Sequence, residues 1–591
     1  MTAEELQELV ETIRKVGIDR QEVEVKTAKR SLPKRLWETL SAFANAPGGG
    51  ILILGLDEER GFKAVGVENP AKIQQDLASL CDKMEPPLRP LIEIHDFEGK
   101  WIVVAEIPEV STGQKPCYYK GSGPFHGSFI RVADGDRRLT EYEVQLLWES
   151  RRQPRHDRAP VPTRTLQDLD NNRLKSFLDR IRGRHPDRFR EWDHPDRFRE
   201  WDDERILTSL GILTPYEDHI RPTLAGYLAF GHYPQDEFPQ LHLSIVYYPT
   251  SRPGALGPGG ERLEENVKVE GNLPEMVLEA IGVLERSLRR RLIQRGVFPE
   301  EVLEYPREFL RECIVNALLH RDYSPQAHGS PVQIRVFPDR IEIENPGGLF
   351  GPVTVDRLGE PGLIAARNAT LMRISEDLPV EPNRMMCENR GTGIVTMMEA
   401  LRAANLSPPQ FEDKRTTFLV RASNITLLDN EALRWLNRLS RHVPLTDSQR
   451  LALVYCQRYG RISHADYRRL NPEMDAPKIT RELSDLVTKG LLVRHGVKRW
   501  TFYVLSETIQ SLVAARRRED RREPILALLA HHGEPMTAKQ IAQALGLSLP
   551  ATRRWLKILR DENRIEITTT SPKSRFVRYR IVPKKDSEGA P

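Results

Sequence analysis

The stretch that decides the fold is RECIVNALLHRDY, residues 311–323. Glu312 and Asn316 stand four residues apart in an apolar run, and positions i and i+4 of a helix share one face. That face would carry a carboxylate suited to a general base and an amide oxygen suited to Mg²⁺. The stretch therefore predicts a helix that lines a site for a metal-bound phosphate, with a polar tail, His320 to Asp322, at its end.

Two glycine-rich segments follow this stretch. ENPGGL (344–349) forms a turn after a predicted strand at 340–344, and NRGTGI (389–394) forms a turn that enters a predicted helix at 394–404. Glycines let backbone N–H groups approach a phosphate, and a helix N-terminus favours negative charge. Each segment alone is equally compatible with a plain turn or a helix cap. The order of all three segments is what indicates a nucleotide site.

Together the three segments resemble the Bergerat-fold (GHKL) ATPase domain, in the divergent form that follows a Schlafen-type AlbA domain in many bacterial proteins. The resemblance implies that Glu312 is the base, that Asn316 is the Mg²⁺ ligand, and that ATP is the nucleotide. The remaining residues implied to contact the nucleotide are Asn345, Gly347, Gly348, Gly391, Thr392 and Gly393. Asn345 replaces the usual adenine-contacting Asp, so the donor and acceptor pattern at the adenine edge differs. Hydrolysis is a separate question, since Glu312 is equally compatible with a helix-surface carboxylate.

Relatives of this type are often labelled RecG-like helicases. This chain contains no GxxxxGK[ST] loop, and on that ground helicase activity is rejected.

The N-terminal part resembles the AlbA_2/Schlafen domain over about residues 15–145. The motifs that carry the resemblance are Glu24-Val25-Lys26, AFAN (42–45), GGGILILGLD (48–57) and a closing strand, FIRV (129–132). In nuclease-active Schlafen proteins three carboxylates hold a divalent metal that activates water against an RNA phosphodiester. The matching positions are Asp19, Glu24 and Asp57, which suit Mg²⁺ or Mn²⁺. Asp19 is Glu in most of the family, and Glu22 is an alternative ligand.

Many AlbA_2 domains serve only as nucleic-acid-binding modules, and that alternative stays open. A basic cluster beside the carboxylates is interpreted as a phosphate-contacting patch, with a solvated loop as the alternative. It comprises Lys26, Lys29, Arg30, Lys34 and Arg35.

The C-terminal part predicts two winged helices. In the second, a helix within 537–547 ends at a Gly turn, and Ser548 caps a helix at 550–561. Its candidate DNA contacts are Arg553, Arg554 and Lys557 on the second helix, and Lys573 and Arg575 in the wing. Residues 447–505 repeat the plan more loosely, with Lys478 and Arg481 on the corresponding helix. A protein-binding winged helix is the alternative for both.

The fold class expected is a multidomain chain of α/β and α+β modules. The predicted divisions are an AlbA_2-like domain at 1–150, a linker plus a helix at 151–205 with the duplicated HPDRFREWD, an intermediate region plus GHKL-like domain at 206–425, and winged helices at 430–508 and 518–583. The net charge is only +4, so any nucleic-acid footprint must be local. The five cysteines form no CxxC pair, which argues against a zinc ribbon or a disulfide framework and fits a cytoplasmic protein. The N-terminus has the pattern of an amphipathic helix rather than a signal peptide, and no apolar run is long enough to span a membrane.

Two functions use all of these modules. The first is an ATP-responsive DNA-binding transcription regulator that forms a homo-oligomer, with duplex DNA or structured RNA as partner. The second is a nucleotide-gated, metal-dependent endoribonuclease that cleaves tRNA or other RNA in antiphage or stress defence. Two winged helices favour the regulator, because winged helices read duplex DNA, whereas the carboxylate trio favours the nuclease.

Overall fold

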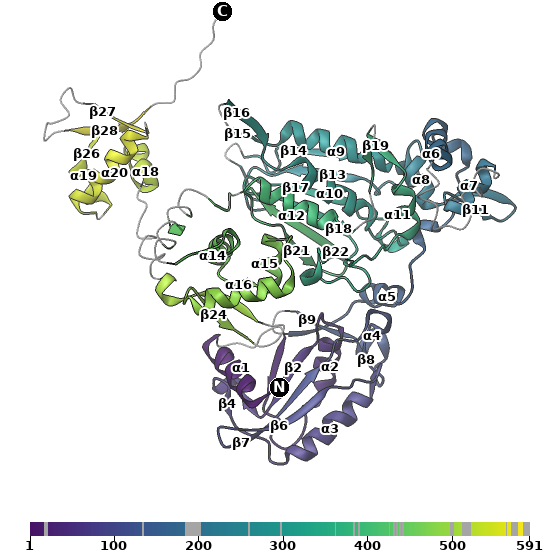
Figure 1. Ribbon diagram of the computed structural model, residues 1–591, viewed down its shortest axis with the longest axis horizontal. Helices are drawn as coiled ribbons and strands as arrows, with labels where there is room; N and C mark the ends of the chain where they lie inside the picture. Colours follow the sequence, from purple (N-terminus) through teal and green to yellow (C-terminus); the bar gives the residue numbers. More distant parts are fainter. Residues whose placement is uncertain are drawn as a thin grey trace, which may run out of the picture. The chain divides into compact units, whose positions relative to one another are not determined.

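The computed structural model divides into two compact units, residues 1–505 and 506–591, and each is described by itself (Figure 1). The structure describes residues 1–16, 22–132, 135–183, 202–257, 260–295, 298–360, 362–381, 384–387, 391–424, 426–428, 432, 435–436, 439, 443–496, 501–510, 522–545, 547–562, 564–568 and 577–582. Asp19, Lys573, Arg575 and the duplicated HPDRFREWD up to residue 201 lie outside these ranges.

A four-stranded sheet in the order β1–β2–β7–β6 organises the N-terminal module. Its elements are α1 (Ala3–Val16), β1 (Val23–Lys26), α2 (Leu36–Asn45), β2 (Gly50–Leu54), α3 (Pro70–Asp82), β6 (Leu91–Phe97) and β7 (Lys100–Ile107). β2 is buried throughout because its residues face two cores. Ile51 and Ile53 pack with α1, and Leu52 and Leu54 pack with α2 and α3. A strand covered on both faces needs an unbroken apolar run, which is what GILIL supplies.

The module closes with a hairpin and a helix that extend from this sheet toward the next module. The hairpin pairs β9 (Phe129–Val132) with β10 (Gly135–Arg138). The helix α5 (Glu141–Glu149) begins with a capping box, in which Thr140 and Glu143 satisfy each other's backbone N–H groups.

A six-stranded sheet in the order β14–β13–β17–β18–β22–β21 organises the central module. Its strands are β13 (Leu243–Tyr247), β14 (Glu265–Val269), β17 (Val332–Val336), β18 (Arg340–Pro346), β21 (Gln410–Asp413) and β22 (Thr417–Ser423). One face packs against helices α9 (Leu273–Ser287), α10 (Arg307–Leu319), α11 (Ala369–Ser375) and α12 (Gly393–Ala403). Alternate strand residues such as Val332, Ile334 and Val336 belong to this core, as a period of two requires.

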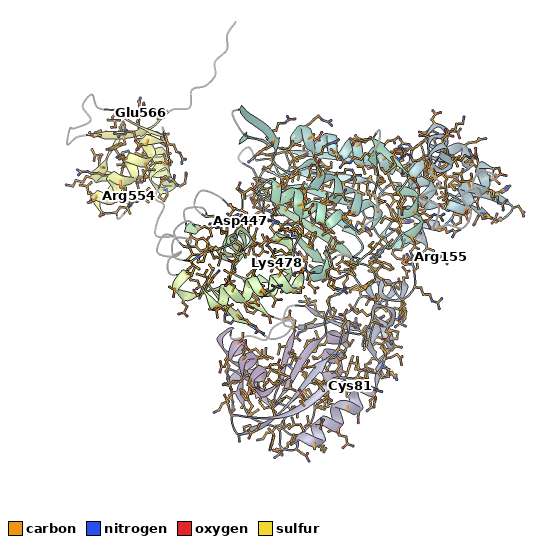
Figure 2. All side chains as sticks on the ribbon, in the orientation of Figure 1. Cys81, Arg155, Asp447, Lys478, Arg554 and Glu566 are labelled. Carbon is orange, nitrogen blue, oxygen red and sulfur yellow. The ribbon has the colours of Figure 1, made fainter. Side chains whose placement is uncertain are left out.

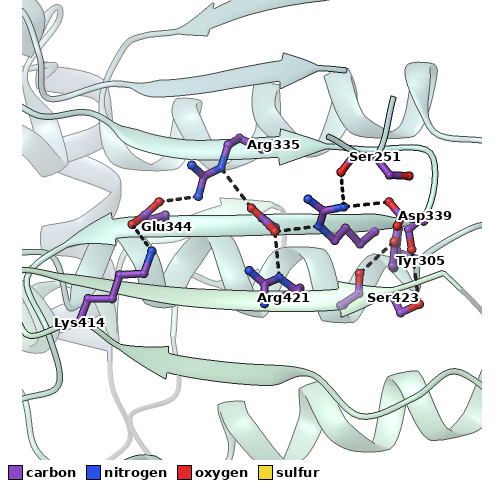
Figure 3. Close-up of polar contacts among 11 residues, drawn as sticks. Ser251, Tyr305, Arg335, Asp339, Glu344, Lys414, Arg421 and Ser423 are labelled. Atoms are coloured by element: carbon purple, nitrogen blue, oxygen red, sulfur yellow. Dashed lines mark hydrogen bonds and ion pairs between the residues drawn. The ribbon is translucent and has the colours of Figure 1, made fainter. Parts of the chain in front are cut away.

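The opposite face of the central sheet is polar and is held by a network of ion pairs (Figure 3). Glu342 is buried and pairs with Arg340 and Arg421 at 2.8 Å each and with Arg335 at 3.4 Å. Burial opposes ionisation of Glu342, but hydrogen bonds from Arg340 and Arg421 outweigh it and keep its pKa below the ordinary value. These pairs hold β17, β18 and β22 in register up to the point where β18 delivers Asn345.

The segment predicted as a linker plus a helix, residues 151–205, contains such a helix, and this helix is folded into the central core. α6 (Asn171–Gly183) buries Leu174, Phe177, Leu178 and Ile181, and the Phe177 ring lies 5.2 Å from that of Phe230 in α8 (Leu224–Phe230). These positions follow the i, i+3, i+4, i+7 pattern of an amphipathic helix. The Arg- and Asp-rich residues between them gave the segment the composition of a linker.

Two further helical modules share one order of elements. In the first unit they are α14 (Asp447–Tyr459), β23 (Ile462–Ser463), α15 (His464–Leu470), α16 (Ala476–Thr488), β24 (Leu492–His495) and β25 (Phe502–Leu505). In the second unit they are α18 (Arg522–His532), β26 (Met536–Thr537), α19 (Ala538–Ala544), α20 (Leu549–Asp561), β27 (Ile565–Ile567) and β28 (Arg578–Ile581). Helices α14, α15 and α19 each begin with a capping box. Both modules have the order of a winged helix, with a three-stranded sheet behind the helices.

The predicted fold class, several α/β and α+β modules in one chain, is therefore confirmed. Among the described helices, none has the combined length and apolarity needed to cross a membrane.

Candidate nucleotide site and nucleic-acid surfaces

A cavity of about 610 Å³ lies where α10, the end of β18 and the start of α12 meet. Its volume is within the range of small-molecule and cofactor sites. Seven of the eight residues predicted to contact the nucleotide line it, and only Gly347 does not. The seven are Glu312, Asn316, Asn345, Gly348, Gly391, Thr392 and Gly393.

Glu312 and Asn316 project from α10 toward the first residue of α12. A Cβ added at Gly393 would lie 2.8 Å from Glu312 Oε2 and 3.3 Å from Asn316 Nδ2. Any larger residue at 393 would therefore press on both side chains. The structure brings the first and third segments of the sequence pattern into direct contact, although about 80 residues separate them.

Glu312 already has a cationic partner. Arg311 Nη1 lies 2.5 Å from Glu312 Oε1, and Arg311 Nη2 donates to the carbonyls of Met385 and Met386 at 2.7 and 2.9 Å. Burial lowers the pKa of Arg311, while the Glu312 charge acts in the opposite direction. A carboxylate that is paired in this way is a weaker proton acceptor than a free one.

The first glycine turn is shaped by chain packing. The N–H of Gly347 donates to the Thr416 carbonyl at 2.7 Å, and the N–H of Gly348 donates to the Arg415 carbonyl at 2.6 Å. Gly347 has a φ of +93°, and a Cβ there would meet Asp322 at 2.8 Å, so glycine is required for the close approach. These two N–H groups are already bonded. The turn at 391–394 is the better source of backbone donors for a phosphate.

Two residues that sequence reasoning missed hold these segments together. Asn368 Nδ2 donates to the carbonyls of Leu319 and Arg321 at 2.9 and 2.7 Å, which fixes the end of α10. Arg367 Nη2 donates to the Gly348 carbonyl at 2.7 Å. Asn368 stands directly before a short helix, but its side chain makes no cap hydrogen bond there, so an N-cap pattern in the sequence would not have revealed its role.

His320, at the end of α10, lines the cavity as a neutral imidazole. Burial lowers its pKa to about 4, and the neighbouring Arg367 charge adds to the effect. At neutral pH the ring is therefore uncharged and offers one donor and one acceptor to a ligand.

The N-terminal module contacts the same region through α5. Tyr142 Oη donates to Asp322 Oδ2 at 2.9 Å, and the Ser324 N–H donates to the other carboxylate oxygen at 2.8 Å. Glu143 pairs with Arg415 at 3.5 Å. Burial and the Asp322 charge raise the pKa of Tyr142, so its hydroxyl keeps the proton that it donates. Tyr142 was not anticipated from the sequence, because its partner is 180 residues away.

The described members of the predicted carboxylate trio carry cationic partners. Glu24 is buried and pairs at 2.5 Å with both Arg131 and Lys26, and Asp57 lies 3.5 Å from Arg60. Arg131 is itself buried and also pairs with Asp136 at 3.1 Å. Asp19 lies outside the described residues. Within the part of the chain that the structure describes, no three His, Cys, Asp or Glu side chains form a group that could hold a metal ion.

The basic cluster of the N-terminal module is partly neutralised. Lys26 pairs with Glu24, Arg30 with Glu68 at 3.0 Å, and Arg35 with Glu38. Lys29 and Lys34 are exposed and form no ion pair among the residues described. These two lysines are therefore the stronger candidates for phosphate contact in this cluster.

The second helices of both winged modules present basic residues outward. On α20, Arg553, Arg554 and Lys557 are exposed, while Leu556 and Leu559 are buried. On α16, Lys478 and Arg481 are exposed above the buried Ile479, Leu483 and Leu486. Figure 2 labels Arg554 on α20 and Lys478 on α16. The predicted wing residues Lys573 and Arg575 lie outside the described ranges.

Comparison with known families places domains on most of the chain. Residues 19–140 match the model described as Schlafen, AlbA_2, and residues 329–421 match "Putative ATP-dependent DNA helicase recG C-terminal". Residues 145–244 match a domain of unknown function (DUF8451), and residues 524–564 match an IclR helix-turn-helix domain. No curated protein matches the chain.

Two solved structures are similar to parts or all of the chain. The DIP2311 protein from Corynebacterium diphtheriae is 17% identical over 98% of this chain and 99% of its own, with a TM-score of 0.34. The N-terminal domain of a putative ATP-dependent DNA helicase RecG-related protein from Nitrosomonas europaea is 32% identical over 24% of this chain and 95% of its own, with a TM-score of 0.19. At these TM-scores neither structure bears on the fold.

The fold and the family matches define a multidomain protein in which an ATPase-like domain is joined to nucleic-acid-binding domains. Three regions of the chain thus match a Schlafen AlbA_2 domain, a RecG C-terminal domain and an IclR helix-turn-helix, which confirms the combination of domains that the sequence resembles.

Proposed function

We propose that this protein is an ATP-responsive nucleic-acid-binding protein that regulates transcription. The observation that carries the proposal is the meeting of Glu312, Asn316 and Gly393 at one wall of a ligand-sized cavity. The modules attached to this cavity are of nucleic-acid-binding families.

The residues of the cavity fit a magnesium nucleotide. Asn316 offers the amide oxygen, and Gly393 leaves the space beside it that a Cβ would fill. The turn at 391–394 places the N-terminus of α12 at the cavity, and Thr392 makes no side-chain cap there. An uncapped helix N-terminus of this kind favours a phosphate. Asn345 and His320 supply polar groups for the base. When bound, ATP supplies a charged triphosphate whose presence or absence distinguishes two states of the domain.

The role proposed for ATP is to change the state of the protein by binding, and not to supply energy by hydrolysis. Glu312 is the carboxylate that lies beside Asn316 and Gly393, and Arg311 already pairs with it at 2.5 Å. Proton abstraction by Glu312 requires that this pair weaken first. Binding of the nucleotide at Asn316 and at the α12 N-terminus has no such requirement. We therefore expect ATP to bind readily and to be hydrolysed slowly.

Duplex DNA is the partner that the winged modules fit best. Each presents a helix with exposed basic residues above a buried apolar face, which is the geometry of a helix that enters a major groove. The ribonuclease alternative draws less support, because Glu24 is committed to Arg131 and Lys26. A metal ligand at position 24 would have to leave both cations.

The proposal is tested by measuring duplex affinity with and without nucleotide. Fluorescence anisotropy of a labelled duplex is followed as the full chain is added, in the presence of MgATP, Mg²⁺ alone, or ATP with chelator. The affinity of wild type for the duplex is expected to change only when MgATP is present. Asn316→Ala is expected to have the same affinity for the duplex in all three conditions, equal to that of nucleotide-free wild type. An equal response in both proteins would reject this site, and absence of duplex binding would reject the regulator.

A control for the nuclease alternative uses the same samples. Labelled tRNA and duplex are incubated with Mn²⁺, with wild type and with Asp57→Ala. Cleavage by wild type that is absent from Asp57→Ala would favour the nuclease over the regulator.

A further inference from the structure

One segment of the central module, residues 349–360 and 362–368, forms a wall of the cavity. It follows the first glycine turn and ends at the Arg367–Asn368 clamp. The wall residues that line the cavity are Leu349, Phe350, Val353, Leu358, Gly359, Leu363, Ile364 and Ala365. A ligand in the cavity would therefore touch this segment directly.

The cavity wall packs against the start of α12. Gly359 has a φ of +84°, and a Cβ there would lie 2.8 Å from Met398 Cε and 3.4 Å from Ile394 Cγ2. The backbone at 359 therefore lies flush on the first turns of α12. Gly391 and Gly393 lead into the same turns of α12. A shift of α12 on phosphate binding would therefore displace the backbone at residue 359.

The outer side of the wall holds α15, the first helix of the helix-turn-helix at 447–505. Arg468 Nη1 pairs with Glu360 Oε1 at 2.7 Å, and Arg469 Nη2 donates to the Val355 carbonyl at 2.7 Å. Arg357 also donates to Glu360 at 2.9 Å, and this second bond fixes the position of the Glu360 carboxylate. Both α15 arginines are largely buried, with side-chain exposures of 19% and 14%, so water screens these contacts less than surface pairs.

A third contact comes from α12 itself. Arg402, in its last turn, pairs at 2.5 Å with Glu473, which lies in the turn between α15 and α16. The wall and α12 thus both hold the winged helix, and both line the cavity at their other ends.

The recognition helix is left open by this arrangement. On α16, Lys478, Arg481 and Ser484 are exposed, while its buried face packs within its own module. The winged helix is therefore held through α15 at the cavity wall and keeps its DNA-facing helix free.

We propose that the winged helix at 447–505 is thermodynamically linked to the nucleotide cavity through Arg468, Arg469 and the wall at Val355–Glu360. The inference rests on the proposed function and adds the route by which the nucleotide acts. A ligand shifts a conformational equilibrium only through contacts that differ between the two states. The wall provides such contacts, because one side faces the ligand and the other side holds α15. Linkage then requires that MgATP change duplex affinity, and that duplex change MgATP affinity, by the same factor.

The test measures this factor in the full chain. Affinity for a labelled duplex is determined with and without a non-hydrolysable ATP analogue and Mg²⁺, and affinity for the analogue is determined with and without duplex. Wild type is expected to give two equal ratios of about 5-fold or more. In Arg468→Ala/Arg469→Ala both ratios are expected to fall toward one, because only the exposed Arg402–Glu473 pair then remains of the three contacts, while each ligand alone binds as it does to wild type.

Two further variants separate a specific contact from general damage. Arg450→Ala removes an arginine of α14 whose ion pair among the described residues is with its neighbour Asp447 at 3.8 Å, and it should keep the wild-type ratios. Arg468→Glu should lose the coupling, and Glu360→Arg added to it should restore part of it, because the pair is rebuilt with its charges exchanged. Thermal unfolding of each variant checks that the module is folded.

The outcomes are distinct from failure of the proposed function. If the analogue does not bind wild type even without DNA, the nucleotide site itself is wrong. If both ligands bind wild type but neither affects the other, the linkage is refuted while the site stands. Retention of the wild-type ratios in Arg468→Ala/Arg469→Ala, or their loss in Arg450→Ala, would also overturn the proposed route.

Discussion

Gly393→Ala tests the candidate site at the point where its segments meet. The added methyl would lie 2.8 Å from Glu312 Oε2 and 3.3 Å from Asn316 Nδ2. Gly393 is the first residue of α12 and has no left-handed φ, so its backbone accepts alanine. The carboxylate is the end of a flexible side chain and can yield by a few tenths of an ångström. Alanine favours helix over glycine by up to about 1 kcal/mol, so the fold should be unharmed.

The effect on nucleotide affinity should be large by comparison. The methyl occupies the space that a phosphate needs beside Asn316 and the N-terminus of α12. A lost hydrogen bond to a charged group costs about 1.5–3 kcal/mol, which corresponds to about 10- to 150-fold weaker binding. The variant should therefore be as stable as wild type and bind MgATP poorly.

The assay pairs isothermal titration calorimetry of MgATP with thermal unfolding of the same samples. Gly282→Ala is a matched control, since it lies inside α9 and its added Cβ would meet the flexible end of Arg286 at 3.3 Å. That control should be slightly stabilised and should bind MgATP normally. An unchanged Kd in Gly393→Ala would show that phosphate does not approach residue 393, and the assignment of the site would fail.

Three other predictions concern the remaining modules and pH. Arg554→Ala should weaken duplex binding and reduce the salt dependence by about one phosphate contact, as measured by anisotropy at several salt concentrations; an unaltered slope would point to a protein partner. Glu24→Ala should destabilise the N-terminal module by about 3 kcal/mol in chemical denaturation, because it leaves Arg131 buried with one partner fewer. The pKa of His320 is about 4 when folded and near 6.5 when unfolded, so its contribution to stability is complete above pH 6.5 and is lost as pH falls toward 4. His320→Gln should lessen the fall in melting temperature across that window, and an identical pH profile would argue against a buried neutral imidazole.

Much of the local structure followed from the sequence because local rules decide it. The i, i+4 spacing placed Glu312 and Asn316 on one face of α10. The strand expected at 340–344 is β18, and the helix expected at 394–404 is α12. The helices expected within 537–547 and at 550–561 are α19 and α20.

What the sequence did not reveal depends on partners far apart in the chain. Tyr142 on Asp322 and Arg468 on Glu360 are ordinary surface residues when read in sequence, and only folding brings each pair together. Glu24 and Arg131 are likewise far apart in the sequence and are brought together only by folding. Their ion pair occupies a carboxylate that was expected to hold a metal ion. A helix was expected within 151–205, but the arginines and aspartates of this segment obscured the apolar period by which α6 packs into the central core.

A calorimetric titration of MgATP into the full chain, set beside Asn316→Ala and a sample with chelator in place of Mg²⁺, measures directly whether the cavity binds a magnesium nucleotide. We expect saturable binding at one site that requires Mg²⁺ and is lost in the variant, because Asn316 is the amide placed at the cavity to hold the metal-bound phosphate. Equal affinity in wild type and Asn316→Ala, or no binding by wild type, would show that the cavity is not such a site.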